Sequence, residues 1–130
     1  MQKLDTTIYD RIFEKVRPLL RSGRPGDYLH IKSVYRSIVL LCEEGTYSVN
    51  PRVLIPAGIL HDCGFGFVKG KYMNFFAGQS KVGAMRDAIN ELTVAYVPAC
   101  LKEFEFSEKE ITEIQEIIKY SDEEVLSIAN

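Results

Sequence analysis

The run from Val53 to Leu60 constrains the fold of this chain most strongly, because its side chains are apolar almost all round. A helix of this composition has to be buried on most of its faces and therefore lies at the centre of a domain. Pro51 suits the first position of a helix, and Pro56 follows early enough for its missing N–H to be tolerated. A buried strand is the alternative for so short a run, but the two prolines and Ala57-Gly58 count against it.

Amphipathic helices are also predicted before this run. The first is expected from Leu4 to Leu20, where the breaker cluster Ser22–Gly26 ends it. The second is expected from about Tyr28 to Glu44, with Asp27 as its N-cap and Gly45 as its stop signal.

Two further helices are predicted after the run. Ser80 is expected to cap a helix that continues to about Val97 and is broken or bent by Pro98. Ser107 and Glu110 form a capping box that starts the last helix. No strand signal or repeat is found, so the sequence predicts an all-α single domain over residues 1–130, a compact bundle of about five or six helices.

Composition limits the class of function. The chain has 130 residues, 46% of them hydrophobic and 26% charged, which is ordinary for a globular domain with a core. A net charge of −2 without blocks of like charge argues against a nucleic-acid partner. The N-terminus lacks the apolar segment of a signal peptide, and no apolar run approaches membrane-spanning length.

Cysteine usage points to a reducing compartment. The three cysteines are widely spaced and form no CxxC pair, which favours buried free thiols (Cys42, Cys63 and Cys100). We therefore expect a cytoplasmic protein without membrane contact, and the sequence leaves the formation of a homo-oligomer open.

The apolar run ends on His61 and Asp62, and His30 is the second of the two histidines in the chain. Adjacent residues on a helix point about 100° apart, but at a helix end both side chains can turn toward one point. A divalent cation there would remove the cost of burying an unpaired Asp62 carboxylate. Two imidazoles and a carboxylate suit a first-row transition metal, which activates water and neutralises phosphate oxygens. The alternative is an internal hydrogen bond, with Asp62 capping the backbone and His61 solvated.

These residues resemble the HD superfamily of metal-dependent phosphohydrolases. The segment Tyr28–Val34 is similar to the family's first ligand helix, and Leu54–Asp62, followed by Cys-Gly-Phe, resembles its second. The resemblance covers about Asp27 to Tyr120, and the spacing between the first and second histidine (61 − 30 = 31) is typical of it. It implies an HD-domain-like fold and a hydrolase acting on a phosphate ester through a metal-activated water. A nucleotide or a related small phosphorylated molecule is the expected substrate.

The resemblance also implies site residues. His30, His61 and Asp62 would ligate one divalent ion (Mn, Fe, Co, Ni, Zn or Mg), with His61 and Asp62 as the catalytic pair. The family takes a fourth ligand from a later aspartate, for which Asp122 is the best-placed residue (122 − 62 = 60 positions on). Otherwise Asp122 is a solvated residue near the end of the last helix. The basic residues expected either to contact phosphate or simply to be solvated are Arg24, Lys32, Lys69 and Lys81.

Two departures from the family pattern leave other functions open. Gly78–Lys81 and Lys119-Tyr120 stand where many relatives have further histidines, so a dinuclear centre is not expected. One alternative is a degenerate HD domain that binds a ligand or partner without turnover. Another is a fragment whose next segment supplies the last ligand. The phenylalanines from Phe65 to Phe76 would form either a roof over the core or a lid that stacks on a nucleobase.

Overall fold

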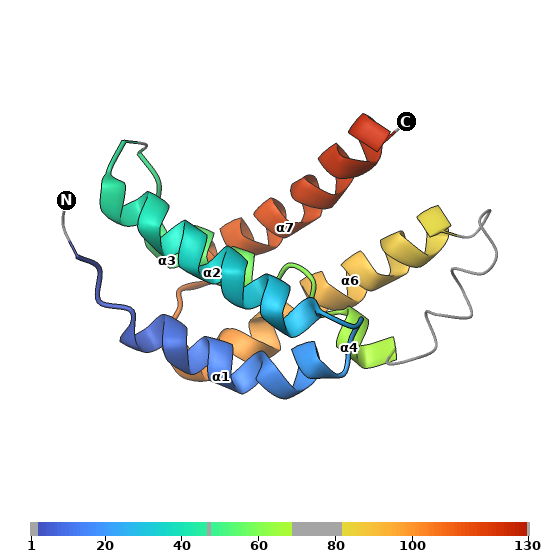
Figure 1. The fold of residues 1–130 in the computed structure, drawn as a ribbon, viewed down its shortest axis with the longest axis horizontal. Coiled ribbons are helices and arrows are strands. Elements are labelled where there is room, and N and C mark those ends of the chain that lie inside the picture. Colours follow the sequence, from blue (N-terminus) through green and yellow to red (C-terminus); the bar gives the residue numbers. More distant parts are fainter. Residues whose placement is uncertain (1–2, 47, 69–81, 130) are drawn as a thin grey trace.

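Helix α3, Pro51–Leu60, is the central element of the fold (Figure 1). The computed structural model describes residues 3–46, 48–68 and 82–129, apart from the side chains at 82–85 and 121–129. Every α3 side chain from Ile55 to Leu60 is buried, and the helix packs against both α2 (Asp27–Glu44) and α7 (Glu108–Ala129). The predicted central helix is therefore confirmed.

The other helices surround this centre. Helix α1 (Thr7–Arg21) packs on α2 and α3, and α6 (Val82–Leu101) packs along α7. Two one-turn helices, α4 (Phe65–Val68) and the 3-10 helix η2 (Lys102–Phe104), complete the regular structure of the described ranges. All of these elements are helical, and five of them have ten residues or more, so the predicted all-α bundle is confirmed.

The core takes one or more fully buried side chains from each long helix. Typical members, one per helix in chain order, are Val16, Ile31, Ile59, Val97 and Ile114. Because α3 contributes on most of its faces, the core forms around it and its C-terminal end is held from several directions. Within the described residues, no helix has the length and the apolar content that a membrane crossing needs.

Two predicted helix starts are confirmed: α3 begins at Pro51, and the capping box precedes α7. The Asn50 side chain accepts from the Arg52 backbone N–H at 3.1 Å and so caps α3. In the capping box, the Glu110 N–H donates to Ser107 Oγ at 3.1 Å, and the Ser107 N–H donates to Glu110 Oε1 at 2.9 Å. The predicted cap at Ser80 lies outside the described residues.

Two local predictions were wrong. Asp27 is not an N-cap: Gly26, with a left-handed φ of 87°, precedes the helix, and the Asp27 carboxylate turns back to the Arg24 backbone N–H at 2.8 Å. Of the two expectations for Pro98, the break is wrong, because α6 continues to Leu101, and the bend stays a prediction. Proline removes the N–H that would bond the carbonyl four residues earlier, and here Gln115 Nε2 of α7 donates to that Val94 carbonyl at 2.9 Å. A partner from another helix thus replaces the missing bond.

Candidate metal centre

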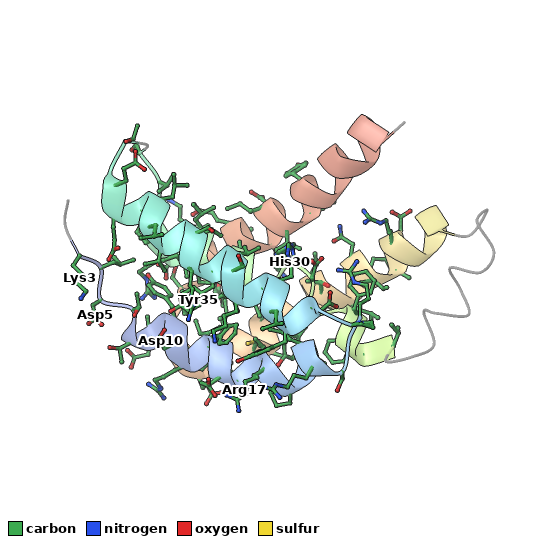
Figure 2. The ribbon with its side chains drawn as sticks, viewed as in Figure 1. Lys3, Asp5, Asp10, Arg17, His30 and Tyr35 are labelled. Atoms are coloured by element: carbon green, nitrogen blue, oxygen red, sulfur yellow. The ribbon has the colours of Figure 1, made fainter. Side chains whose placement is uncertain are left out.

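His30, His61 and Asp62 form one cluster, as the sequence predicted for a metal site. Each offers a ligand atom, and these atoms lie within 4.8 Å of one another. Figure 2 shows His30 on the side of α2 that is turned away from α1, where α2 packs on α3. The rings of His30 and His61 are 6.2 Å apart between centroids and inclined by 70°. His30 is exposed, and the other two side chains are partly buried, so the cluster opens to solvent on the His30 side.

The end of α3 explains how two adjacent residues face one point. The helix ends at Leu60, and residues 61–64 form turns, in which the Cys63 N–H donates to the Leu60 carbonyl at 3.0 Å. His61 still has helical dihedral angles (φ −59°, ψ −25°), and within these turns its Nε2 approaches Asp62 Oδ2 to 3.2 Å. Helices α2 and α3 lie close together near this end, because a Cβ at Gly58 would meet the end of the Ile38 side chain of α2.

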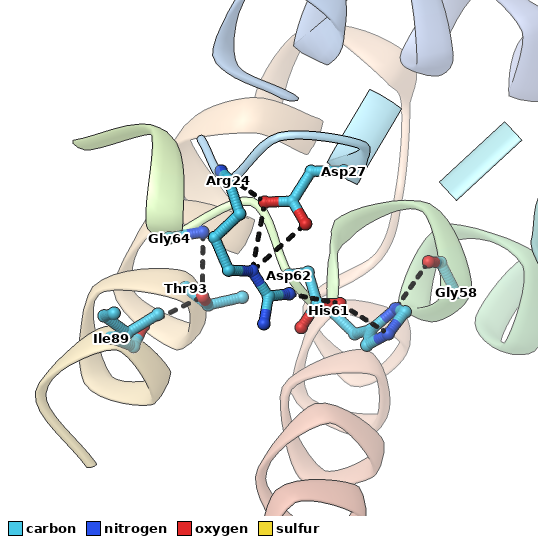
Figure 3. Close-up of polar contacts among 8 residues, drawn as sticks. All are labelled: Arg24, Asp27, Gly58, His61, Asp62, Gly64, Ile89 and Thr93. Carbon is cyan, nitrogen blue, oxygen red and sulfur yellow. Dashed lines mark hydrogen bonds and ion pairs between the residues drawn. The ribbon is translucent and has the colours of Figure 1, made fainter. Parts of the chain in front are cut away.

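The hydrogen bonds of His61 show what the cluster can hold. Its Nδ1 lies 2.7 Å from the Gly58 carbonyl oxygen, which can only accept, so Nδ1 carries the hydrogen (Figure 3). In the neutral ring, Nε2 is then unprotonated and presents a lone pair. That lone pair points at a carboxylate oxygen of Asp62, an arrangement that is repulsive unless a proton or a cation lies between them. Two ligands bound about 2.1 Å from one ion, about 90–109° apart, would be about 3.0–3.4 Å from each other. The observed 3.2 Å fits such a ligand pair.

The charges of the pair are coupled. Burial opposes the charged form of His61, but the hydrogen bond and charge of Asp62, with the Gly58 carbonyl, outweigh it and raise the His61 pKa. Burial likewise opposes the Asp62 carboxylate, but His61 and Arg24 outweigh it and lower the Asp62 pKa. Asp62 is therefore an anion at neutral pH, and a proton on His61 and a divalent cation compete to neutralise it.

Arg24 is the predicted phosphate contact that the structure brings to this cluster. Its Nη2 lies 3.3 Å from Asp62 Oδ2, and its Nε donates to Asp27 (Figure 3). Its guanidinium also stacks 3.6 Å from the centre of the Phe65 ring. The expectation that Asp62 caps the backbone finds no support, because the carboxylate contacts His61 and Arg24 instead.

The other predicted residues are not brought to the cluster by the described part of the chain. Lys32 lines a groove between α1 and α2 together with Phe13 and Tyr28. It lies two residues after His30, about 200° further round the helix. Lys69 and Lys81 lie outside the described residues. Asp122 lies on α7, at a position whose side chain is not described.

The aromatic loop is only partly described. Phe65 is buried and packs with Ile89 of α6, as expected for a roof over the core. Phe67 is 46% exposed and stacks edge-on against Tyr96 at 5.2 Å between ring centroids. Phe75 and Phe76 lie outside the described residues.

Sequence reasoning missed two residues that hold the site in place. The first is Asp27, whose carboxylate accepts a hydrogen bond from Arg24 Nε. The second is Thr93 of α6, which is fully buried. Its hydroxyl accepts from the Gly64 N–H at 3.0 Å and donates to the Ile89 carbonyl at 2.9 Å. Thr93 thereby fixes the turn that follows Asp62. One signal for Thr93 is present in the sequence: it stands four residues from both Ile89 and Val97, as a polar residue on an apolar helix face.

A scan of the sequence against protein-family models finds no match, and searches of curated proteins and of solved structures find none either. The function is therefore inferred from the geometry of His30, His61, Asp62 and Arg24.

Proposed function

We propose that this protein is a metal-dependent phosphohydrolase of the HD type, which hydrolyses a phosphate ester of a small molecule such as a nucleotide. His30, His61 and Asp62 hold one divalent cation, and Asp122 is the candidate for a fourth ligand. One observation supports this most directly: the Nε2 lone pair of His61, set by the Nδ1–Gly58 hydrogen bond, faces an anionic Asp62 oxygen at 3.2 Å. A divalent cation between these atoms turns a repulsive contact into two ligand bonds.

The donor set also fits hydrolytic chemistry. Three protein ligands leave positions open for water and substrate, and the exposed edge at His30 gives access. When bound, a divalent cation lowers the pKa of water and neutralises phosphate oxygens. The residues of the chain then orient the substrate and the ion: Arg24 offers a guanidinium to the phosphate, and the hydrogen bond between Nδ1 and the Gly58 carbonyl directs Nε2 of His61 toward the cation.

The alternative is a degenerate HD domain that binds a ligand or a partner protein without turnover. The ion pair between Arg24 and Asp62 favours it, because this pair, with a protonated His61, can neutralise Asp62 without a metal.

Metal analysis and an activity panel distinguish the two functions. The protein is stripped with a chelator, reloaded with Mn²⁺, and assayed on phosphomonoesters, phosphodiesters and nucleotides. We expect wild type to bind Mn²⁺ and hydrolyse at least one class, and Asp62→Asn to weaken metal binding and lower kcat/KM by about 100-fold or more. Asp87→Asn is the matched control, since Asp87 is an exposed aspartate on α6.

Retention of both bound metal and hydrolysis by Asp62→Asn would show the proposal to be wrong. A wild-type protein that hydrolyses nothing in the panel, but whose Tm is raised by a nucleotide, would support the degenerate domain instead.

A further inference from the structure

The guanidinium of Arg24 is held on three sides. Its Nε lies 3.1 and 3.3 Å from the two carboxylate oxygens of Asp27, one face lies on Phe65, and Nη2 faces Asp62 Oδ2. An arginine side chain normally loses much rotamer entropy on binding a ligand, and a guanidinium held in this way has lost most of it in advance. The Arg24 side chain is nevertheless 29% exposed, so that a solute can reach it.

Asp27 is the residue that fixes this arrangement. It is 5% exposed, and in the described part of the chain both of its oxygens are taken by Arg24, through the backbone N–H and Nε. A buried carboxylate is costly unless it is paired and hydrogen-bonded. Gly23 makes room for it, because a Cβ there would lie 2.7 Å from Asp27 Oδ2 and 3.3 Å from the Phe65 Cβ. The turn before α2 is thus built around the contact between Asp27 and Arg24.

The guanidinium keeps donors for a ligand. Among the described residues, no hydrogen bond is formed by the Nη1 hydrogens of Arg24, whereas Nε is taken by Asp27 and Nη2 faces Asp62. A phosphoryl group presents several oxygens and is the ligand that a fixed guanidinium binds with two parallel hydrogen bonds.

A cation in the cluster and Arg24 compete for the same oxygen, Asp62 Oδ2. If a divalent ion takes that oxygen, Arg24 loses Asp62 as a partner, keeps Asp27, and lies beside a second positive charge. An anion that bridges the two cations removes this repulsion. Each of the two ligands, metal and phosphoryl anion, then improves the binding of the other, because the coupling of two sites is reciprocal.

We infer that Asp27 is a positioning residue: it fixes Arg24 at the edge of the His30–His61–Asp62 cluster, so that a phosphoryl anion and the divalent cation bind cooperatively. The inference rests on the proposed function for the metal. Beyond the proposed function, it assigns to Asp27 the role of fixing Arg24, and it predicts that the binding of the anion and the binding of the cation are coupled.

Calorimetric titration with Mn²⁺, with and without saturating methylphosphonate, measures this coupling without any turnover. For wild type we expect methylphosphonate to lower the Kd for Mn²⁺ about tenfold. Asp27→Asn and Arg24→Lys should reduce the effect to less than about twofold, because a neutral amide releases Nε and an ammonium lacks the planar fork. In Arg24→Lys, the Kd for Mn²⁺ alone should be unchanged or lower, since the competitor for Asp62 is weakened.

Arg21→Lys is the matched control. Arg21 ends α1 close to Arg24 in the sequence, stacks on Tyr28 at 4.4 Å, and should keep the full tenfold coupling. Arg24→Lys keeps a positive charge beside Asp27, so it tests the coupling through the held guanidinium even where Asp27→Asn fails to fold.

The outcomes separate the two proposals. Mn²⁺ binding by wild type without an effect of methylphosphonate, or full coupling in a folded Asp27→Asn or in Arg24→Lys, overturns the inference and leaves the metal site standing. A wild-type protein that binds no Mn²⁺ overturns both.

Discussion

Thr93 shows how one side chain far from the motif in sequence supports the site. Its hydroxyl is fully buried, accepts from the Gly64 N–H and donates to the Ile89 carbonyl. Gly64 has to be a glycine, because a Cβ there would collide with Thr93 Oγ1 and with the Ile89 carbonyl oxygen. The turn that carries His61 and Asp62 is therefore anchored to α6 by a contact that leaves no room for a side chain.

We predict that Thr93→Val lowers the free energy of unfolding by about 1–3 kcal/mol, because the Gly64 N–H stays buried without an acceptor. Urea denaturation measures this loss. The looser turn should also weaken Mn²⁺ binding about tenfold, as loss of a supporting hydrogen bond around a metal site typically does. Thr93→Ser keeps both hydrogen bonds and should keep the wild-type Kd for Mn²⁺. Equal Mn²⁺ affinity in the Val and Ser variants would refute the supporting role of the hydroxyl.

The elements α3 and α7 are tied together at their N-terminal ends. Arg52 of α3 donates through Nε to Glu110 Oε2 at 2.6 Å and through Nη2 to the Glu105 carbonyl at 3.0 Å, and it stacks on Phe106. Glu110 also closes the capping box with Ser107. The hydrogen bond from Arg52 and those from Ser107 hold the pKa of Glu110 at about 2, below its ordinary 4.5. One carboxylate thus caps α7 and joins it to the helix that ends in the candidate site.

This contact predicts a pH dependence of stability. A lowered folded-state pKa means that the carboxylate stabilises the fold above pH 4.5 and that this contribution is lost as the pH falls toward 2. Glu110→Gln should therefore be less stable than wild type at pH 6, and the gap should shrink steadily between pH 4.5 and pH 2. Urea unfolding at several pH values measures the gap.

Glu116→Gln is the control on the same helix, because its side chain is exposed. It should stay within about 0.5 kcal/mol of wild type at pH 6. A gap for Glu110→Gln that does not change with pH would contradict the assignment.

For the whole molecule, the buried thiols report how the bundle opens. Cys63 and Cys100 are fully buried and Cys42 is partly buried, and all three are free, so the expectation of buried free thiols is confirmed for the first two. Burial raises the pKa of each thiol. Cys63 follows Asp62 directly and lies in the same core cluster as α1, α6 and α7 side chains. Its exposure requires the centre of the bundle to open.

We predict that Ellman's reagent labels Cys42 first in the native protein, because it is the most accessible of the three thiols. Cys63 and Cys100 should react only at the rate set by global unfolding and should accelerate with urea in parallel. Cys42→Ser should remove the fast phase and leave the slow one. Labelling of Cys63 as fast as Cys42 would mean that the turn at the site opens without the rest of the core.

The sequence by itself determined the helical architecture, because it depends on local signals. The apolar run of α3, the capping box at Ser107 and the breakers around Gly26 and Gly45 act over a few residues and need no knowledge of neighbours. The association of His30 with His61 and Asp62 was expected from the resemblance to the HD superfamily and from the spacing of the two histidines, and not from helix periodicity.

Only the tertiary structure decided which polar groups meet. The pairing of Thr93 with Gly64 and of Gln115 with the Val94 carbonyl joins different segments, and no local pattern specifies such partners. The place of Lys32 in the groove between α1 and α2 likewise depends on which face of α2 packs against α1, although its separation from His30 follows from the helical period alone. Helices follow from periodicity along the chain, whereas the orientation of charge and hydrogen bonds at a site follows from how those helices are packed.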